Sequence, residues 1–110
     1  SSLLKPASDR LRERMAGLSF SAPAIPLVNN VDVAIINDPA QIKDALVRQA
    51  AAPVRWVECV QKMAAEGVTH VIECGPGKVL AGMTKRIDGN LVGGAIFDPA
   101  SLQETLALLK

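Results

Sequence analysis

Hydrophobic residues near the start of the chain recur at the spacing of an amphipathic helix. Leu4, Leu11, Met15 and Leu18 alternate with stretches of charged residues, which gives one apolar and one polar side. The pattern predicts a helix that ends near Gly17.

Three short apolar runs have the length and composition of buried β-strands. They occupy residues 27–31, 68–74 and 91–97, and turn-forming residues follow the second and third of them. The segments between and after these runs return to helical spacing. They predict further helices over residues 39–49, 56–63, 79–86 and 102–109.

Two proline-containing signals fix where helices begin. Asp38 and Pro39 supply a capping residue and a proline at the first helical position, and Gln41 is placed to complete a reciprocal cap. Asp98 and Pro99 repeat the cap and the proline. Further along, Gly67 is placed to end the third helix in a left-handed conformation.

Alternating strands and helices with short connections predict an α/β fold, with a short parallel sheet flanked by helices. We expect residues 1–110 to form one segment of a domain rather than two domains. Three strands make a narrow sheet, however, and five helices around it leave sheet edges exposed. The chain also opens at Ser1 rather than Met, directly in a helical pattern. Both features predict that it begins inside a larger protein.

Composition narrows the possible functions. The chain is 49% hydrophobic and 21% charged, and its formal charge of +1 indicates neither nucleic acid nor an anionic membrane as a partner. No apolar run has the length of a membrane span, and no segment resembles a signal peptide. Two cysteines, Cys59 and Cys74, are too few for a disulfide framework in a chain of this length. We therefore expect a cytoplasmic protein with reduced cysteines.

The residues from Glu73 to Lys78 join a strand to a helix through glycine and proline. Backbone amides at such a helix start can hold a phosphate, but the segment lacks the serine or threonine that follows the lysine of a phosphate-binding loop. A tight structural turn is the alternative. His70 is the only histidine, and its position at the start of a strand favours a structural role over catalysis. No Cys/His spacing resembles a zinc site.

Lys85 and Arg86, together with Lys78, form a small basic group near the predicted end of a helix. Cations are stabilised there by the helix dipole, so solvated charges are one explanation. An acidic protein partner or a phosphate is the other.

Six segments taken together resemble the malonyl-CoA:acyl carrier protein transacylases of bacterial type II fatty acid synthesis. They follow one another in the same order over essentially the whole chain, and polyketide synthase acyltransferase domains share them more loosely. The segments are Lys5-Pro-Ala, Val28-Asn-Asn-Val-Asp, Ala45-Leu-Val-Arg-Gln, Pro53-Val-Arg-Trp, Glu73-Cys-Gly-Pro-Gly-Lys-Val-Leu and Thr84-Lys-Arg.

The resemblance implies that residues 1–110 are the carboxy-terminal segment of an acyltransferase domain with an α/β-hydrolase-like core. Such enzymes move malonyl from CoA to the phosphopantetheine thiol of acyl carrier protein through a seryl ester, with a histidine as general base. They need no metal or redox cofactor. The serine elbow would lie upstream of this chain, and the histidine would immediately precede Ser1. The expected partners are acyl carrier protein, malonyl-CoA and the missing amino-terminal part, and the isolated fragment is expected to be inactive.

The resemblance also implies roles for six residues. Gln49 would orient the absent histidine through its backbone carbonyl, because the imidazole must be held in one tautomer. Gly75, Gly77 and Val79 would lie at the substrate pocket, and Lys85 and Arg86 would receive the acidic carrier protein. A non-catalytic α/β module that binds a carrier protein or another chain is the alternative.

Overall fold

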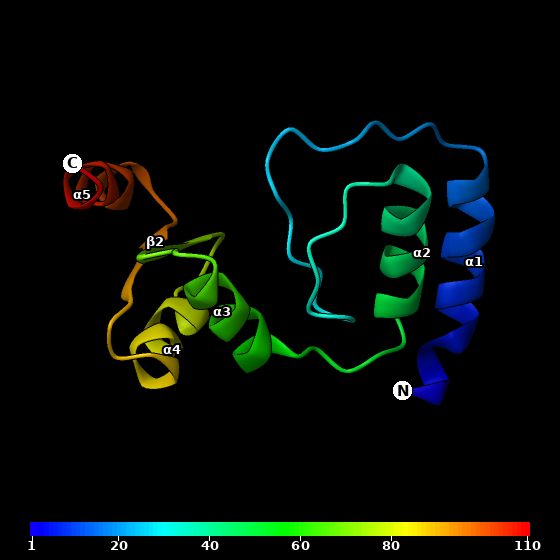
Figure 1. Ribbon diagram of the computed structural model, residues 1–110, viewed down its shortest axis with the longest axis horizontal. Coiled ribbons are helices and arrows are strands. Elements are labelled where there is room, and N and C mark those ends of the chain that lie inside the picture. Colours follow the sequence, from blue (N-terminus) through cyan, green and yellow to red (C-terminus); the bar gives the residue numbers. More distant parts are fainter. The chain divides into compact units, whose positions relative to one another are not determined.

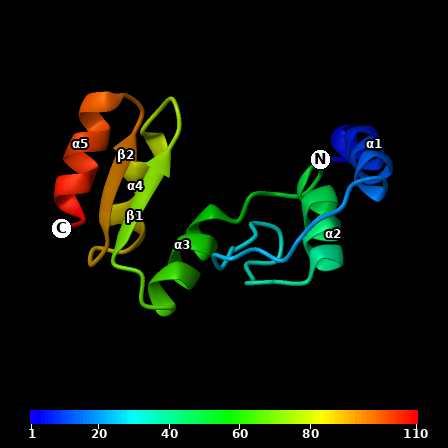
Figure 2. The same ribbon diagram turned by 90° about the horizontal axis from the view of Figure 1, so that it is seen from above.

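The computed structural model describes residues 1–110, which form two compact units, Ser1–Cys59 and Val60–Lys110 (Figures 1 and 2). The boundary between the two units falls within a helix. In chain order the elements are the 3-10 helix η1 (Ser2–Leu4), α1 (Lys5–Ala16), α2 (Pro39–Gln49), α3 (Trp56–Ala65), β1 (His70–Cys74), α4 (Val79–Ile87), β2 (Val92–Ile96) and α5 (Pro99–Leu108). None of the helices is both long and apolar enough to cross a membrane.

In the first unit, α1 lies alongside α2 (Figures 1 and 2). The predicted first helix is confirmed, with Gly17 as its C-terminal cap residue. The hydroxyl of Ser8 donates to the carbonyl oxygen of Val47 at 2.6 Å and so joins the two helices. The core of this unit lies on α2, where Ile42, Ala45 and Val47 are buried.

The start of α2 follows the predicted signal in part. Pro39 occupies the first turn, and the Asp38 carboxylate accepts from the Gln41 backbone N–H at 3.0 Å. This satisfies one of the four amides that a helix start leaves without partners. The reciprocal bond from the Gln41 side chain is not formed, so the capping box is half complete.

The strand predicted over residues 27–31 is wrong. Only one antiparallel bridge forms there, between Val28 and Ile35. The cause is the buried side chain of Asn29, which accepts from the Asp32 N–H at 2.7 Å and donates to the Ala34 carbonyl at 3.2 Å. These local bonds fold the segment into a turn and take the place of a strand ladder. We call residues 28–35 the asparagine loop.

In the second unit, β1 and β2 pair in parallel, from His70 opposite Val92 to Cys74 opposite Ile96. The connection between them runs through α4, and α5 follows β2. This confirms the α/β class and the predicted parallel pairing, although the sheet has two strands rather than three. Gly67, with φ at 96°, ends the helical segment before β1 in the left-handed conformation that the sequence predicts.

Two successive glycines show how the helices cover the sheet. A Cβ atom on Gly93 would lie 2.8 Å from the carbonyl oxygen of Ala81 in α4, whereas one on Gly94 would meet Leu108 of α5 at 3.5 Å. Neighbouring residues of a strand point to opposite faces, so α4 covers one face and α5 the other (Figure 1). The absence of side chains at both glycines lets the helices approach the strand closely.

The start of α5 carries the complete capping box. The Asp98 carboxylate accepts from the Ser101 N–H at 2.7 Å, and the Ser101 hydroxyl accepts from the Asp98 N–H at 3.0 Å. The same hydroxyl also accepts from the Phe97 N–H at 2.9 Å. The predicted helix start is confirmed, and this cap fixes the chain where β2 ends.

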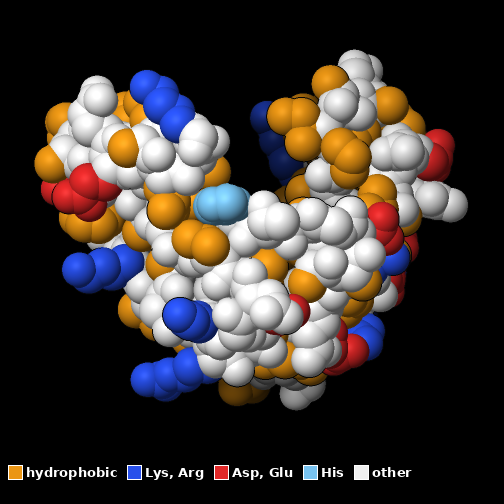
Figure 3. All heavy atoms as spheres, turned by 60° about the vertical axis from the view of Figure 1, so that its left-hand side comes forward, with side chains coloured by type: hydrophobic (Ala, Val, Ile, Leu, Met, Phe, Trp, Pro, Cys, Tyr) orange, Lys and Arg blue, Asp and Glu red, His pale blue; other side chains and the backbone are white.

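Many large hydrophobic side chains reach the surface (Figure 3). In the second unit they include Phe97 after β2, and Leu102, Leu106 and Leu108 of α5. Because the sheet has only two strands, one edge of each strand also has no strand beside it. The exposed sheet edges predicted from the sequence are therefore present.

The close approach of α4 to β2 gives a test of the packing. We predict that Gly93→Ala lowers the free energy of unfolding by roughly 1–3 kcal/mol, because the new methyl group collides with backbone and cannot be accommodated by a side-chain rotation. The matched control is Gly82→Ala in α4, where a Cβ meets nothing within 4 Å. That change should raise the free energy of unfolding by roughly 0.5–1 kcal/mol. Denaturant titration measures both, and equal effects would contradict the packing.

Candidate functional site

The carboxyl ends of β1 and β2 open onto a shallow hollow of about 480 Å³. It is lined by Gly75 and Pro76 after β1, by the segment from Ile96 to Pro99 after β2, and by Leu102. The Gly75 N–H donates to the Ile96 carbonyl at 3.1 Å, which continues the strand pairing by one residue. Ligand sites in parallel sheets gather at this edge. The hollow is the candidate binding surface of the second unit.

The turn after β1 holds two of the predicted substrate residues, Gly75 and Gly77. Neither has a positive φ, and a Cβ on either would meet nothing within 4 Å. The backbone of this unit therefore does not require glycine at either position.

The phosphate alternative for this turn meets a competitor from the chain itself. The carboxylate of Glu73 accepts from the Ala81 N–H at 3.0 Å, in the first turn of α4. The amide groups and the positive dipole end of a helix attract anions, and here a carboxylate supplies the anion. The Glu73 side chain therefore fixes how α4 begins, and this contact disfavours a phosphate at the same place.

Val79, the third predicted substrate residue, is the first residue of α4 and is 75% exposed. Gly75 lines the hollow, whereas Gly77 and Val79 lie just beyond it in the chain. The ammonium group of the neighbouring Lys78 lies 5.7 Å from the centre of the Phe97 ring, within the range of a cation–π contact. That contact joins the turn after β1 to the segment after β2.

Lys85 and Arg86 occupy the last turn of α4, as predicted, and both are exposed. Neither forms an ion pair within the chain, so their charges are available to a partner. His70 is the first residue of β1, at the end of the strand opposite the hollow. Its Nδ1 lies 2.8 Å from the Thr69 hydroxyl, a local contact that fits the predicted structural role.

Gln49 belongs to the first unit and is the last residue of α2. Its carbonyl accepts from the Ala52 N–H at 3.4 Å, a long bond that leaves a lone pair of the oxygen for a second donor. The amino group of Ser1 donates to the carbonyl of Ala51, only two residues on. The start of the chain therefore lies near the carboxyl end of α2 (Figure 1).

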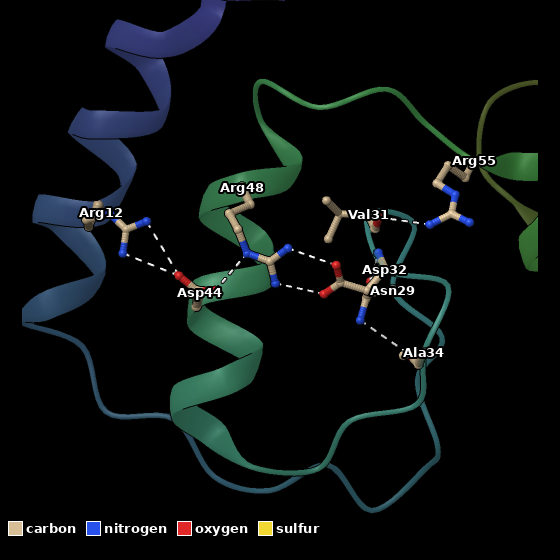
Figure 4. A network of polar contacts seen from close by, with 8 residues as sticks. All are labelled: Arg12, Asn29, Val31, Asp32, Ala34, Asp44, Arg48 and Arg55. Carbon is tan, nitrogen blue, oxygen red and sulfur yellow. Dashed lines mark hydrogen bonds and ion pairs between the residues drawn. The ribbon is translucent and has the colours of Figure 1, made fainter.

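An ion-pair network, which the sequence reasoning missed, lies one residue before Gln49 (Figure 4). Arg48 donates to both oxygens of Asp32, at 2.9 and 2.7 Å, and through Nε to Asp44 at 2.7 Å. Arg12 of α1 reaches the other oxygen of Asp44 at 3.5 Å. The network thus connects the asparagine loop, α2 and α1. We call these four residues the Arg48 network.

The network shifts the acid–base equilibria of its members. Hydrogen bonds from Arg48 hold the pKa values of Asp32 and Asp44 below the usual range, against a smaller opposing effect of desolvation. The same bonds raise the pKa of Arg48. On the other side of the asparagine loop, Arg55 pairs with Glu58 and lowers the pKa of that carboxyl group.

The two cysteines lie in different surroundings. Cys59 is buried and donates to the Asn29 carbonyl at 3.7 Å, and burial raises the pKa of its thiol. Cys74 is exposed, and both cysteines are free. No group of three or more His, Cys, Asp or Glu side chains is arranged to hold a metal ion.

Comparison with known proteins gives a consistent result over almost the whole chain. The malonyl CoA-acyl carrier protein transacylase of Salmonella typhimurium is 52% identical over 104 residues, which are 94% of this chain and 34% of that protein. The crystal structure of an acyl-carrier-protein S-malonyltransferase from Burkholderia pseudomallei superposes with a TM-score of 0.92 at 76% identity, covering 97% of this chain and 35% of that one. This chain is a homologue of the malonyl CoA-acyl carrier protein transacylases.

A third match is a transacylase solved in complex with a type II polyketide synthase acyl-carrier protein. It is 46% identical and superposes with a TM-score of 0.90. The match covers 96% of this chain and 34% of that one. No family model matches the sequence. The chain spans about a third of the length of the transacylases it matches, which fits the predicted carboxy-terminal segment. The resemblance to malonyl-CoA:acyl carrier protein transacylases is thereby confirmed.

The residues that sequence reasoning missed differ in how they could be found. Asp44 and Arg48 are four residues apart on α2, a spacing that predicts an ion pair on a helix surface. Phe97 is the last residue of the strand predicted over residues 91–97 and could be placed at the carboxyl edge of the sheet. The pairing of Arg48 with Asp32 spans 16 residues and leaves no periodic signal.

The lowered pKa values predict how stability depends on pH. A carboxyl group whose pKa is lower in the folded state stabilises the protein above its unfolded pKa, near 4, and loses this effect as pH falls through the folded value. We predict that Asp44→Asn lowers the melting temperature at neutral pH, and that the difference from wild type shrinks as pH falls from about 4 through the lowered pKa of Asp44. Thermal melts between pH 2.5 and 7 measure it. A difference that persists at the acid end would contradict the ion-pair explanation.

Proposed function

We propose that this chain is the carboxy-terminal part of an enzyme that transfers malonyl from CoA to the phosphopantetheine thiol of acyl carrier protein in fatty acid biosynthesis. A serine outside the chain attacks the thioester carbonyl, and the CoA thiol leaves. The carrier thiol then attacks the resulting ester and releases the serine. A histidine that precedes Ser1 accepts the serine's proton in the first step and passes it to the departing CoA sulfur; in the second step it accepts the proton of the carrier thiol and passes it to the serine oxygen.

The observation that carries the proposal is the match to transacylases, which holds both in sequence and in structure. The two matches cover 94% and 97% of the chain. Similarity at this level extends through the turn after β1 and the end of α4, where the proposed binding residues lie. Since the chain corresponds to a third of each relative, the activity belongs to the longer protein.

The geometry at the carboxyl end of α2 supports the role of Gln49. Because the Ser1 nitrogen is bonded to the Ala51 carbonyl, a residue attached to that nitrogen is held close to Gln49. A carbonyl in the last turn of a helix lies at the negative end of the dipole, which favours an imidazole N–H and still more an imidazolium. A backbone carbonyl can therefore do the work that a carboxylate does in other triads.

The second unit supplies the proposed binding residues. Gly75, Gly77 and Val79 would border the entrance for the malonyl and pantetheine groups, and the place of Gly75 in the lining of the hollow supports this. Lys85 and Arg86 would contact the acidic carrier protein, as unpaired exposed cations. One relative was solved with an acyl-carrier protein bound, which supports such a partner here. Two free cysteines support the further proposal that the protein is cytoplasmic.

Two measurements together test the proposed function. The intact mass of the natural protein should be near three times the 11.6 kDa of this chain, and that protein should transfer labelled malonyl from CoA to holo acyl carrier protein. The isolated 110-residue chain should transfer none. A natural protein of 11.6 kDa that binds carrier protein without transfer would instead establish the non-catalytic module.

The role of the Gln49 carbonyl leads to a prediction about its side chain. We predict that Gln49→Ala in the full-length protein changes kcat/KM by less than about threefold, since the backbone carbonyl is kept. Gln49→Pro is the contrasting variant, because the ring displaces the helix backbone around the carbonyl, and it should lower kcat by at least roughly a hundredfold. Steady-state kinetics measure both. A loss of several orders of magnitude in Gln49→Ala would contradict the assignment.

The basic residues at the end of α4 give a separate prediction. Lys85→Glu combined with Arg86→Glu should raise the KM for carrier protein roughly tenfold and leave the KM for malonyl-CoA unchanged, because only the carrier approaches this surface. The matched control reverses Arg10 and Arg14 of α1, which are also exposed and unpaired. An unchanged KM for carrier protein in the α4 variant would refute this surface.

A further inference from the structure

We propose that Arg48 is a positioning residue, which holds the Gln49 carbonyl in place by clamping the last turn of α2 to the asparagine loop. The inference rests on the proposed role of Gln49. Arg48 itself touches no reacting group. Its effect would pass through the backbone of the next residue.

The first part of the argument is the form of the contact. Arg48 uses Nε, Nη1 and Nη2 in three bonds of 2.7 to 2.9 Å to two carboxylates. Exposed ion pairs usually contribute little because two mobile side chains must be ordered for one contact. Here one guanidinium is held by both partners at once, so the ordering cost is shared. Bidentate geometry also fixes the direction of the contact, which a lysine cannot do.

The second part is the rigidity of the loop to which Arg48 is attached. Asn29 is 7% exposed and holds the loop through its bonds to Asp32 and Ala34. Val33 has φ at 54°, a conformation that β-branched residues rarely adopt and that persists only where surrounding contacts impose it. Asp32 is therefore presented from a fixed backbone, and Arg48 is bound to a firm support (Figure 4).

The third part is where the loop makes its other contacts. The Asn30 carbonyl accepts from the Arg55 N–H at 3.3 Å, and the Arg55 side chain donates to the Val31 carbonyl at 3.5 Å. Arg48 and Arg55 lie on either side of residues 49–54, which contain most of the connection from α2 to α3. The asparagine loop is thus hydrogen-bonded to the residues on both sides of this segment. Between the two arginines lie the Gln49 carbonyl and the Ala51 carbonyl that holds Ser1.

The test uses the full-length protein with Arg48→Gln and, as a second variant should that one fail to fold, Asp32→Asn. Both remove the bidentate contact; Asp32→Asn does so at nearly constant volume, whereas Arg48→Gln also shortens the side chain. We expect kcat to fall roughly tenfold or more with both KM values within twofold of wild type, because misplacing a catalytic group slows the chemistry without weakening substrate binding. Arg48→Lys keeps the charge and should recover part of the loss.

The matched control is Arg12→Gln, which removes a 3.5 Å contact from the same network without touching the loop. It should leave kcat unchanged. If Arg12→Gln and Arg48→Gln lower kcat equally, or if kcat falls only in proportion to the folded fraction, the network is merely structural and the inference is overturned.

A second readout does not depend on activity. The Ala52 N–H donates to the Gln49 carbonyl, so hydrogen exchange at Ala52 reports on that carbonyl directly. We expect exchange at Ala52 to accelerate roughly tenfold in Arg48→Gln and to be unchanged in Arg12→Gln. Unaltered exchange in Arg48→Gln would overturn the inference. If the wild-type protein transfers no malonyl, the proposed function fails, while the exchange data still decide whether Arg48 positions the carbonyl.

Discussion

The bidentate contact between Arg48 and Asp32 is the interaction on which the geometry of the first unit depends. Without it, the asparagine loop would be attached to the helices only through Arg55, Cys59 and its own backbone. With it, a loop stabilised by one buried asparagine side chain is fixed to the end of α2. The three arginines 12, 48 and 55 then connect α1, α2, the loop and the start of α3 through carboxylates and carbonyls (Figure 4). A polar scaffold of this kind is suited to holding backbone carbonyls at fixed positions.

The arrangement of the second unit depends on two glycines of β2, where the helices approach the strand closely because no side chain intervenes. Gly93 and Gly94 bring α4 and α5 onto opposite faces of β2, while buried Thr84 and Thr105 fill the narrow space on each side. At the carboxyl edge, Glu73 fixes the start of α4 and the Asp98–Ser101 box fixes the start of α5. The hollow at this edge is therefore bordered by the start of α5, whose position is set by hydrogen bonds, and by the turn that leads into α4.

The features that could be predicted from the sequence are those encoded within a few residues. The caps at Asp38 and Asp98, the left-handed Gly67 and the five helices all follow from local patterns, and the structure confirms them. The strand over residues 27–31 could not be judged from its apolar composition, because the Asn29 side chain supplies bonds that compete with strand pairing. The roles of Gln49, Gly75, Gly77, Val79, Lys85 and Arg86 came from resemblance to a family, since no spacing in the chain encodes them. The contact from Arg48 to Asp32 could not be predicted from the sequence, because it depends on how the loop folds back on α2.

The two adjacent glycines of β2 have an evolutionary consequence. A side chain at residue 93 can be accommodated only if α4 withdraws, because its nearest contact is the backbone carbonyl oxygen of Ala81, and one at residue 94 only if Ile72 or Leu108 becomes smaller. The residue that each position can hold thus depends on neighbours in other elements. The neighbours of the two positions lie on opposite faces of the strand. Homologous chains should therefore exchange these residues in linked pairs that join distant parts of the sequence, and the spacing of both helices from the sheet should drift more slowly than the surfaces they expose.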